Sequence, residues 1–191
     1  MKSGFVAVAG RPNVGKSTLL NALVGEKVAI VSPVPHTTRH RIRGVVTEGD
    51  AQLVLVDLPG WQRPVDMLTE RMQERVDETM ADDLDAVLMV VNARERIGAG
   101  DRYVAQKVFS LGIPVIIVVN KVDRLKPAHT ITQMKAAATF GKFHALHPVS
   151  AKTGDGIDEL KKDLISILPE GPHFFPAGEV DRKSTRLNSS H

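Results

Sequence analysis

Cysteine is absent from this sequence of 191 residues, which excludes disulfide frameworks and every cysteine-based metal or redox site. Aromatic residues make up only 4% of the chain against 42% hydrophobic residues, so the core must be mainly aliphatic. The longest apolar runs, such as 86–91 and 115–119, fall far short of the roughly 20 residues of a membrane span. No signal peptide precedes the first expected strand. We therefore expect a cytoplasmic protein.

An excess of charge of one sign is also missing from most of the chain. The net charge is +3, but residues 182–191 carry three basic and no acidic residues, so the remainder is balanced. This balance argues against a basic nucleic-acid-binding face on the domain itself. We interpret 1–168 as one domain, the proline-rich stretch 169–181 as a linker leaving it, and 182–191 as a polar tail that does not look native.

Short apolar runs alternate with amphipathic segments along the chain. The expected strands are 5–9, 42–47, 53–56, 86–91, 115–119 and about 146–149. The expected helices are 17–24, about 65–80, 99–111, about 130–140 and 157–168. Because strands and helices alternate and one pair of strands reads as a hairpin, the sequence predicts an α/β fold. We expect a three-layer domain whose mostly parallel six-stranded sheet has one antiparallel strand and helices on both faces.

The first chemical motif, GRPNVGKS at 10–17, matches the P-loop pattern GxxxxGK[ST] between an expected strand and an expected helix. Its glycines let the backbone turn N–H groups toward phosphates at the helix N-terminus. Lys16 supplies positive charge to the β- and γ-phosphates, and the Ser17 hydroxyl is a magnesium ligand. A chance glycine-rich turn is the alternative, which the flanking strand and helix disfavour.

Two further segments fit magnesium and the γ-phosphate. Asp57-Leu-Pro-Gly60 follows an expected strand, so the Asp57 carboxylate can hold magnesium and the Gly60 N–H can reach the γ-phosphate. In the loop before the hairpin, Thr38 is preferred over Thr37 as the residue that closes on magnesium and γ-phosphate and lets go after hydrolysis. Alone, an Asp-x-Pro-Gly sequence is usually a turn.

Asn120-Lys121-Val122-Asp123 indicates which base is bound. The Asp123 carboxylate can accept hydrogen bonds from the guanine ring N–H and the exocyclic amino group, a donor pair that adenine lacks. Asn120 is expected to tie this loop to the P-loop, and the Lys121 stem to cover the face of the ring. Ser150-Ala151-Lys152 follows the last strand, where the Ala151 N–H would face the guanine O6.

These motifs predict a GTP-hydrolysing enzyme that binds GTP or GDP with Mg²⁺. The residues expected to contact the nucleotide are Gly10, Arg11, Pro12, Asn13, Val14, Gly15, Lys16, Ser17, Thr18, Asp57, Leu58, Pro59, Gly60, Asn120, Lys121, Val122, Asp123, Ser150, Ala151 and Lys152. Those expected to serve catalysis are Lys16, Thr38, Gly60 and Asn13. The expected magnesium ligands are Ser17, Thr38 and Asp57.

Together with TTRHRI at 37–42 and HFFP at 173–176, these motifs resemble the Era-type GTPases of the TrmE–Era group over residues 1 to about 181. The resemblance implies a bacterial cytoplasmic protein that assists assembly of the small ribosomal subunit. It also implies binding to 16S rRNA through a C-terminal KH domain, and peripheral membrane association.

The sequence departs from this family in two respects. It contains no GxxG loop, the mark of a KH domain, so we expect rRNA binding to be lost or weakened in this chain. Trp61 stands where many GTPases have a glutamine that orients the attacking water, and an apolar side chain cannot do this.

Asn13 offers another catalytic route, because its amide oxygen is a suitable ligand for K⁺. The resemblance points the same way, since potassium-activated members of the group carry asparagine here. The alternative is that Asn13 only stabilises the turn of the P-loop. Two other functions also stay open for the chain: the GTPase domain of a tRNA-modification protein of the same group, and a recruitment switch with negligible turnover.

Overall fold

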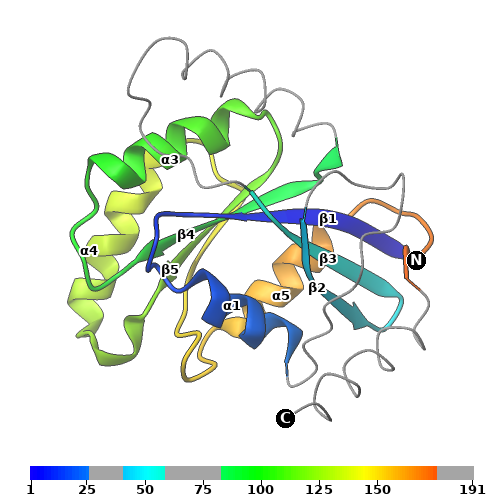
Figure 1. The fold of residues 1–191 in the computed structure, drawn as a ribbon. Helices are drawn as coiled ribbons and strands as arrows, with labels where there is room; N and C mark the ends of the chain where they lie inside the picture. The colour runs from blue at the N-terminus through cyan, green and yellow to red at the C-terminus, as the bar shows by residue number, and fades with distance from the viewer. Residues whose placement is uncertain (26–40, 59–82, 176–191) are drawn as a thin grey trace.

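The computed structural model of the protein describes residues 1–25, 41–58 and 83–175. A twisted sheet lies between two layers of helices (Figure 1). Several predictions fall outside the described residues. They concern Thr37, Thr38, Pro59, Gly60, Trp61, the helix expected at about 65–80 and the tail 182–191.

The described part of the chain forms a six-stranded sheet in the order β2-β3-β1-β4-β5-β6. Its strands are β1 (Lys2–Ala9), β2 (Arg41–Glu48), β3 (Ala51–Asp57), β4 (Ala86–Asn92), β5 (Val115–Asn120) and β6 (Ala145–Pro148). β2 runs antiparallel to β3, and the other neighbouring pairs are parallel. The predicted mixed sheet is therefore confirmed, and the carboxyl ends of the parallel strands meet at one edge.

Helices cover both faces of the sheet, as the sequence predicts. They are α1 (Lys16–Val24), α3 (Ala99–Ser110), α4 (Pro127–Ala137) and α5 (Ile157–Ser166), with the short 3₁₀ helices η2 (Val122–Arg124) and η3 (Ala138–Phe140). Buried leucines of α1 and α5 share one apolar cluster, whereas Val104 and Val108 of α3 and Ala137 of α4 belong to the cluster on the opposite face. Figure 1 shows the same division.

β4 and β5 are apolar at every position except their last, an asparagine, because both faces of these strands are covered. In β4, Leu88 and Val90 face the cluster shared with α1 and α5, while Val87, Met89 and Val91 face the cluster shared with α3 and α4. All five side chains are at most 1% exposed. The continuous apolar run that marked this strand in the sequence is thus a direct consequence of the three-layer architecture.

Two element boundaries differ from the prediction for identifiable reasons. β1 begins at Lys2 rather than at residue 5, because Lys2–Gly4 pair with Ala51–Leu53 of β3. α4 begins at Pro127 rather than near 130, with the proline at the start of the first turn, where its missing N–H costs no hydrogen bond.

The stretch expected to be a linker is instead packed on the domain as far as Phe175. Its backbone runs along the start of β1, where Ser3 N donates to Pro169 O at 3.1 Å. The buried side chain of Gln52 then accepts from the N–H groups of Phe174 and Phe175 at 2.8 and 3.0 Å and donates to Phe175 O at 2.8 Å. Phe175 is 2% exposed in the core, so residues 169–175 belong structurally to the domain.

Replacing Gln52 with leucine should therefore lower the free energy of unfolding by about 1–3 kcal/mol, because buried backbone groups of the last segment lose their partners. Denaturant unfolding of the parent and of Gln52→Leu measures the difference. The matched control is Gln106→Leu on the exposed face of α3, which should stay within about 0.5 kcal/mol of the parent. Equal stabilities for the two variants would contradict the role of Gln52.

Candidate functional site

The P-loop connects β1 to α1 at the carboxyl edge of the sheet. Gly10 has a φ of 155°, and a Cβ there would lie 2.6 Å from the Val90 carbonyl oxygen. Gly15 has a φ of 93°, and a Cβ there would lie 2.4 Å from Nδ2 of Asn120. Both positions thus require glycine, Gly10 for close approach to β4 and Gly15 for close approach to Asn120 at the end of β5. Because α1 starts immediately after Gly15, its free N–H groups open into this turn.

Lys16 is the first residue of α1, and its ammonium group donates to the Gly10 carbonyl oxygen at 2.5 Å. Burial lowers the pKa of Lys16, and the Asp57 carboxylate opposes this shift. Ser17 and Thr18 follow in the first turn of α1 and are exposed. A half-buried cation, two hydroxyls and a helix N-terminus therefore converge here, which is a suitable environment for phosphate oxygens.

Asp57 ends β3 and pairs with a residue that the motifs do not include. Nη1 of Arg43 lies 3.5 Å from Oδ2 of Asp57. The register of β2 on β3 skips from Ile42 to Gly44, so Arg43 is the extra residue of a β-bulge. A bulge re-aims a side chain, here toward the end of the neighbouring strand. Because nothing in the local sequence marks this bulge, sequence reasoning missed Arg43.

The loop after β5 is joined to the P-loop by one buried side chain. Nδ2 of Asn120 donates to the Val14 carbonyl oxygen at 3.0 Å, and its Oδ1 accepts from the Ala151 N–H at 3.1 Å. Asn120 is 2% exposed. The tie to the P-loop expected from the sequence is therefore present, and the same amide also holds the loop after β6.

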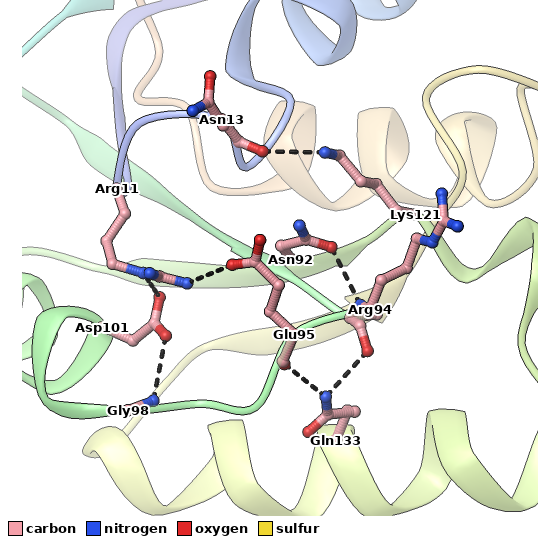
Figure 2. Close-up of polar contacts among 10 residues, drawn as sticks. Arg11, Asn13, Asn92, Arg94, Glu95, Gly98, Asp101, Lys121 and Gln133 are labelled. Carbon is pink, nitrogen blue, oxygen red and sulfur yellow. Dashed lines mark hydrogen bonds and ion pairs between the residues drawn. The ribbon is translucent and has the colours of Figure 1, made fainter.

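Side chains next to Asn120 in the loops after β5 and β6 form further hydrogen bonds. Nζ of Lys121 donates to the Asn13 carbonyl oxygen at 2.9 Å, which lays the lysine stem against the P-loop (Figure 2). The Ser150 hydroxyl donates to Oδ1 of Asp123 at 3.0 Å. This hydrogen bond lowers the pKa of the Asp123 carboxyl, and Lys152 and Arg124 act in the same direction. The carboxylate is therefore held ionised and exposed.

These loops enclose a pocket of about 280 Å³. It is lined by Gly15, Thr18, Arg94, Asn120, Lys121, Asp123, Arg124, Ser150, Ala151 and Lys152. Eight of the ten were expected from the motifs, although the segments that carry them are up to about 130 residues apart in sequence. Three other motif residues, Val14, Leu58 and Val122, pack in or against the core, so they hold their loops in place instead of lining the pocket.

Arg94 and Arg124 line the pocket but were not predicted. Arg124 directly follows the base motif and could have been included by its position. Arg94 lies in the turn after β4, where its N–H donates to Oδ1 of Asn92 at 3.0 Å. Figure 2 shows the Arg94 side chain extending toward Lys121. The wall of the pocket is consequently more basic than the motifs alone indicate.

Arg11 is the motif residue whose side chain leaves the pocket. Its guanidinium extends toward α3 and forms ion pairs with Asp101 at 2.9 Å and with Glu95 at 3.0 Å (Figure 2). Pro12 and Asn13 are exposed on the outer side of the same loop. Asn13 has a φ of 67°, a left-handed conformation that asparagine tolerates better than most residues.

The oxygen donors near Lys16 suit Mg²⁺ better than they suit a metal whose ligands all come from the protein. Asp57 is close enough to Lys16 to affect its pKa, and Ser17 follows Lys16 in α1. A hydroxyl and a single carboxylate are oxygen donors that suit Mg²⁺, which usually completes its shell with water and phosphate oxygens. No group of three or more His, Asp or Glu side chains gathers as a metal site within the described ranges. None of the helices described there is long and apolar enough to cross a membrane.

The sequence of this chain is similar to those of known GTPases. GTPase Era of Lactobacillus delbrueckii subsp. bulgaricus is 45% identical over 179 residues, which are 94% of this chain and 59% of the relative. GTPase Era of Alkaliphilus metalliredigens is 39% identical over 186 residues, covering 97% of this chain and 63% of the relative. The chain thus spans about three-fifths of the length of these curated relatives.

A solved structure of Era in complex with MgGDPNP and nucleotides 1506–1542 of 16S ribosomal RNA superposes with a TM-score of 0.70. It is 38% identical and covers 92% of this chain and 60% of that chain. Residues 5–121 match the family described as 50S ribosome-binding GTPase, from β1 through the P-loop to the start of the base motif. Since this match extends over more than half of its residues, the chain belongs to the 50S ribosome-binding GTPase family.

Proposed function

We propose that this chain binds GTP and GDP with Mg²⁺ and hydrolyses GTP to GDP and phosphate as a molecular switch. The observation that carries the proposal is the pocket built by Asn120, Asp123 and Ser150. Asn120 joins three loops, and the Ser150 hydroxyl aims the Asp123 carboxylate at the pocket rim. A fixed, ionised acceptor beside a P-loop is the arrangement that distinguishes guanine from adenine.

The residues around α1 would serve the phosphates and the metal. Lys16 and the first N–H groups of α1 would bind phosphate oxygens, while Ser17 and Asp57 would hold Mg²⁺ with Thr38. When bound, Mg²⁺ would neutralise charge on the β- and γ-phosphate oxygens. Hydrolysis forms a bond from water to the γ-phosphorus and breaks the bond to the bridging oxygen, and GDP leaves with that electron pair.

The ribosomal part of the proposal rests on the relatives. The Era structure that resembles this chain holds GDPNP and a fragment of 16S rRNA, the RNA of the small subunit. We infer that the protein acts in the cytoplasm in assembly of the small ribosomal subunit. The domain described here would then supply the nucleotide-dependent step.

GTP and GDP should bind on the order of 10⁴-fold more tightly than ATP, because adenine would leave the Asp123 carboxylate without its donors. Competition titration with a fluorescent GDP analogue measures the ratio. Asp123→Asn should shift preference toward xanthosine nucleotides, whereas the matched control Asp155→Asn, an exposed acid of the neighbouring loop, should leave it unchanged. Equal affinity of the parent for ATP and GTP would sink the guanine assignment.

The magnesium dependence of hydrolysis tests the role of Asp57. Asp57→Asn should raise the Mg²⁺ concentration that gives half-maximal phosphate release by about 10–100-fold, the usual cost of losing a carboxylate that holds a metal through a water molecule, as we expect of Asp57. Asp50→Asn, at the hairpin turn beyond the other end of β3, is the control and should leave this concentration unchanged. Phosphate release that persists in excess chelator would contradict magnesium-dependent hydrolysis.

Potassium activation tests Asn13. The Asn13 side chain is exposed and points away from Lys121 in Figure 2, while its backbone carbonyl is the group that Lys121 contacts. We propose that its amide oxygen binds K⁺, which would neutralise charge developing between the β- and γ-phosphates. At equal ionic strength, K⁺ should accelerate hydrolysis over Na⁺ in the parent, and Asn13→Ala should abolish the difference. If the parent hydrolyses GTP equally fast in both salts, the K⁺ site does not exist.

A further inference from the structure

The P-loop arginine is held by two carboxylates from other parts of the chain. Nε of Arg11 donates to Oδ1 of Asp101 at 2.9 Å, and Nη2 donates to Oε2 of Glu95 at 3.0 Å. The side chain of Asp101 is 3% exposed, so the carboxylate of this ion pair is shielded from water. The guanidinium charge is therefore compensated within the protein.

Asp101 is itself fixed in the first turn of α3. Its second oxygen accepts from the Gly98 N–H at 3.3 Å, so the carboxylate bridges the start of the helix and the P-loop (Figure 2). Gly100 makes room for this contact, because a Cβ there would lie 2.7 Å from Cδ of Arg11. A glycine inside a helix costs about 1 kcal/mol relative to alanine, and the close approach of the arginine stem accounts for its presence.

The second carboxylate belongs to a loop that α4 holds in place. Nε2 of Gln133 donates to the carbonyl oxygens of Ala93 and Glu95 at 2.8 and 2.7 Å. Gln133 is 7% exposed. The contacts of Arg11 thus end on two helices, α3 directly and α4 through the loop after β4.

The P-loop needs such support because its backbone is unusual. Gly10 and Gly15 have positive φ, which glycine tolerates, but Asn13 also has positive φ, and a non-glycine residue keeps such a strained conformation only when its surroundings hold it. Asn120 and Lys121 hold the carbonyl groups of the loop from the side of the base pocket. Arg11 holds it from the other side.

We propose that Arg11 is a positioning residue: through Asp101 and Glu95 it fixes the P-loop on α3 in the geometry that binds phosphate, and its charge does not act on the phosphates. The inference rests on the proposed guanine-nucleotide binding. The proposal makes a specific prediction about Asp101, whose carboxylate accepts hydrogen bonds from the Arg11 side chain and from the Gly98 N–H. Removing the negative charge of Asp101 should damage nucleotide binding as removal of the arginine does.

The test is a double-mutant cycle on GDP affinity with Arg11→Met, Asp101→Asn and the double variant. Each single variant should weaken GDP binding by about tenfold, and the double variant should bind no more weakly than the weaker single one, as expected for partners in one network. Arg11→Lys should recover only part of the loss, because an ammonium cannot match the forked pairing of a guanidinium. The matched control Arg102→Met, an exposed α3 arginine paired with Thr139, should bind GDP like the parent.

If Arg11 acted on the phosphates, Asp101→Asn would not weaken GDP binding. Asp101→Asn would then release Arg11 toward the nucleotide and leave GDP affinity unchanged or higher, while Arg11→Met would lower it. That result, additive losses, or unchanged affinity in both single variants would overturn the proposal. Glu95→Gln is a second variant in case Asp101→Asn does not fold, because Glu95 is 56% exposed, and it should weaken GDP binding about twofold to threefold.

Hydrogen exchange of the nucleotide-free protein separates this inference from the proposed function. Amides of residues 10–15 should exchange faster in Arg11→Met and Asp101→Asn than in the parent and in Arg102→Met. Unchanged exchange in both variants would overturn the positioning role even in a protein that binds GDP. A parent protein that does not bind GDP would instead reject the proposed function and leave the exchange result to decide the role of Arg11.

Discussion

The rest of the site depends on the buried side-chain amide of Asn120. Its two polar atoms pair with the Val14 carbonyl and the Ala151 N–H, which lie in different loops. A buried polar group without a partner costs about 1–3 kcal/mol. The Asn120 amide can therefore stay buried only while the P-loop and the loop after β6 keep their positions beside it. Gly15 follows from the same constraint, since any side chain there would collide with this amide. The phosphate and base regions are therefore joined by one side chain.

The cations around the P-loop are not equivalent. Arg11 is neutralised by two carboxylates, and Lys121 donates to a backbone carbonyl at the rim. Lys16 also donates to a carbonyl, but burial lowers its pKa, and the Asp57 carboxylate compensates its charge only in part. An anionic ligand beside Lys16 would remove this deficit, so among these three residues Lys16 gains most from a phosphate.

The sequence predicted the parts of the site that are local. The P-loop and the Asn120 motif each follow a buried strand, and in a parallel sheet that position alone brings them to one edge. The contacts of Arg11 with Asp101 and of Gln52 with Phe175 join residues 90 and 123 positions apart, and neither pair has a local signature. The bulge at Arg43 depends on the pairing register of two strands. Proline content predicted a linker after residue 168, but the buried hydrogen bonds of Gln52 outweigh that tendency.

β3 connects the proposed magnesium site with residues 174 and 175, far from it in sequence. The strand carries Asp57 at one end and, five residues earlier, Gln52, whose side chain grips Phe174 and Phe175. At about 3.3 Å per residue these two points are roughly 17 Å apart along the strand. Three hydrogen bonds of Gln52 therefore anchor Phe174 and Phe175 to the same strand that ends at the proposed magnesium site.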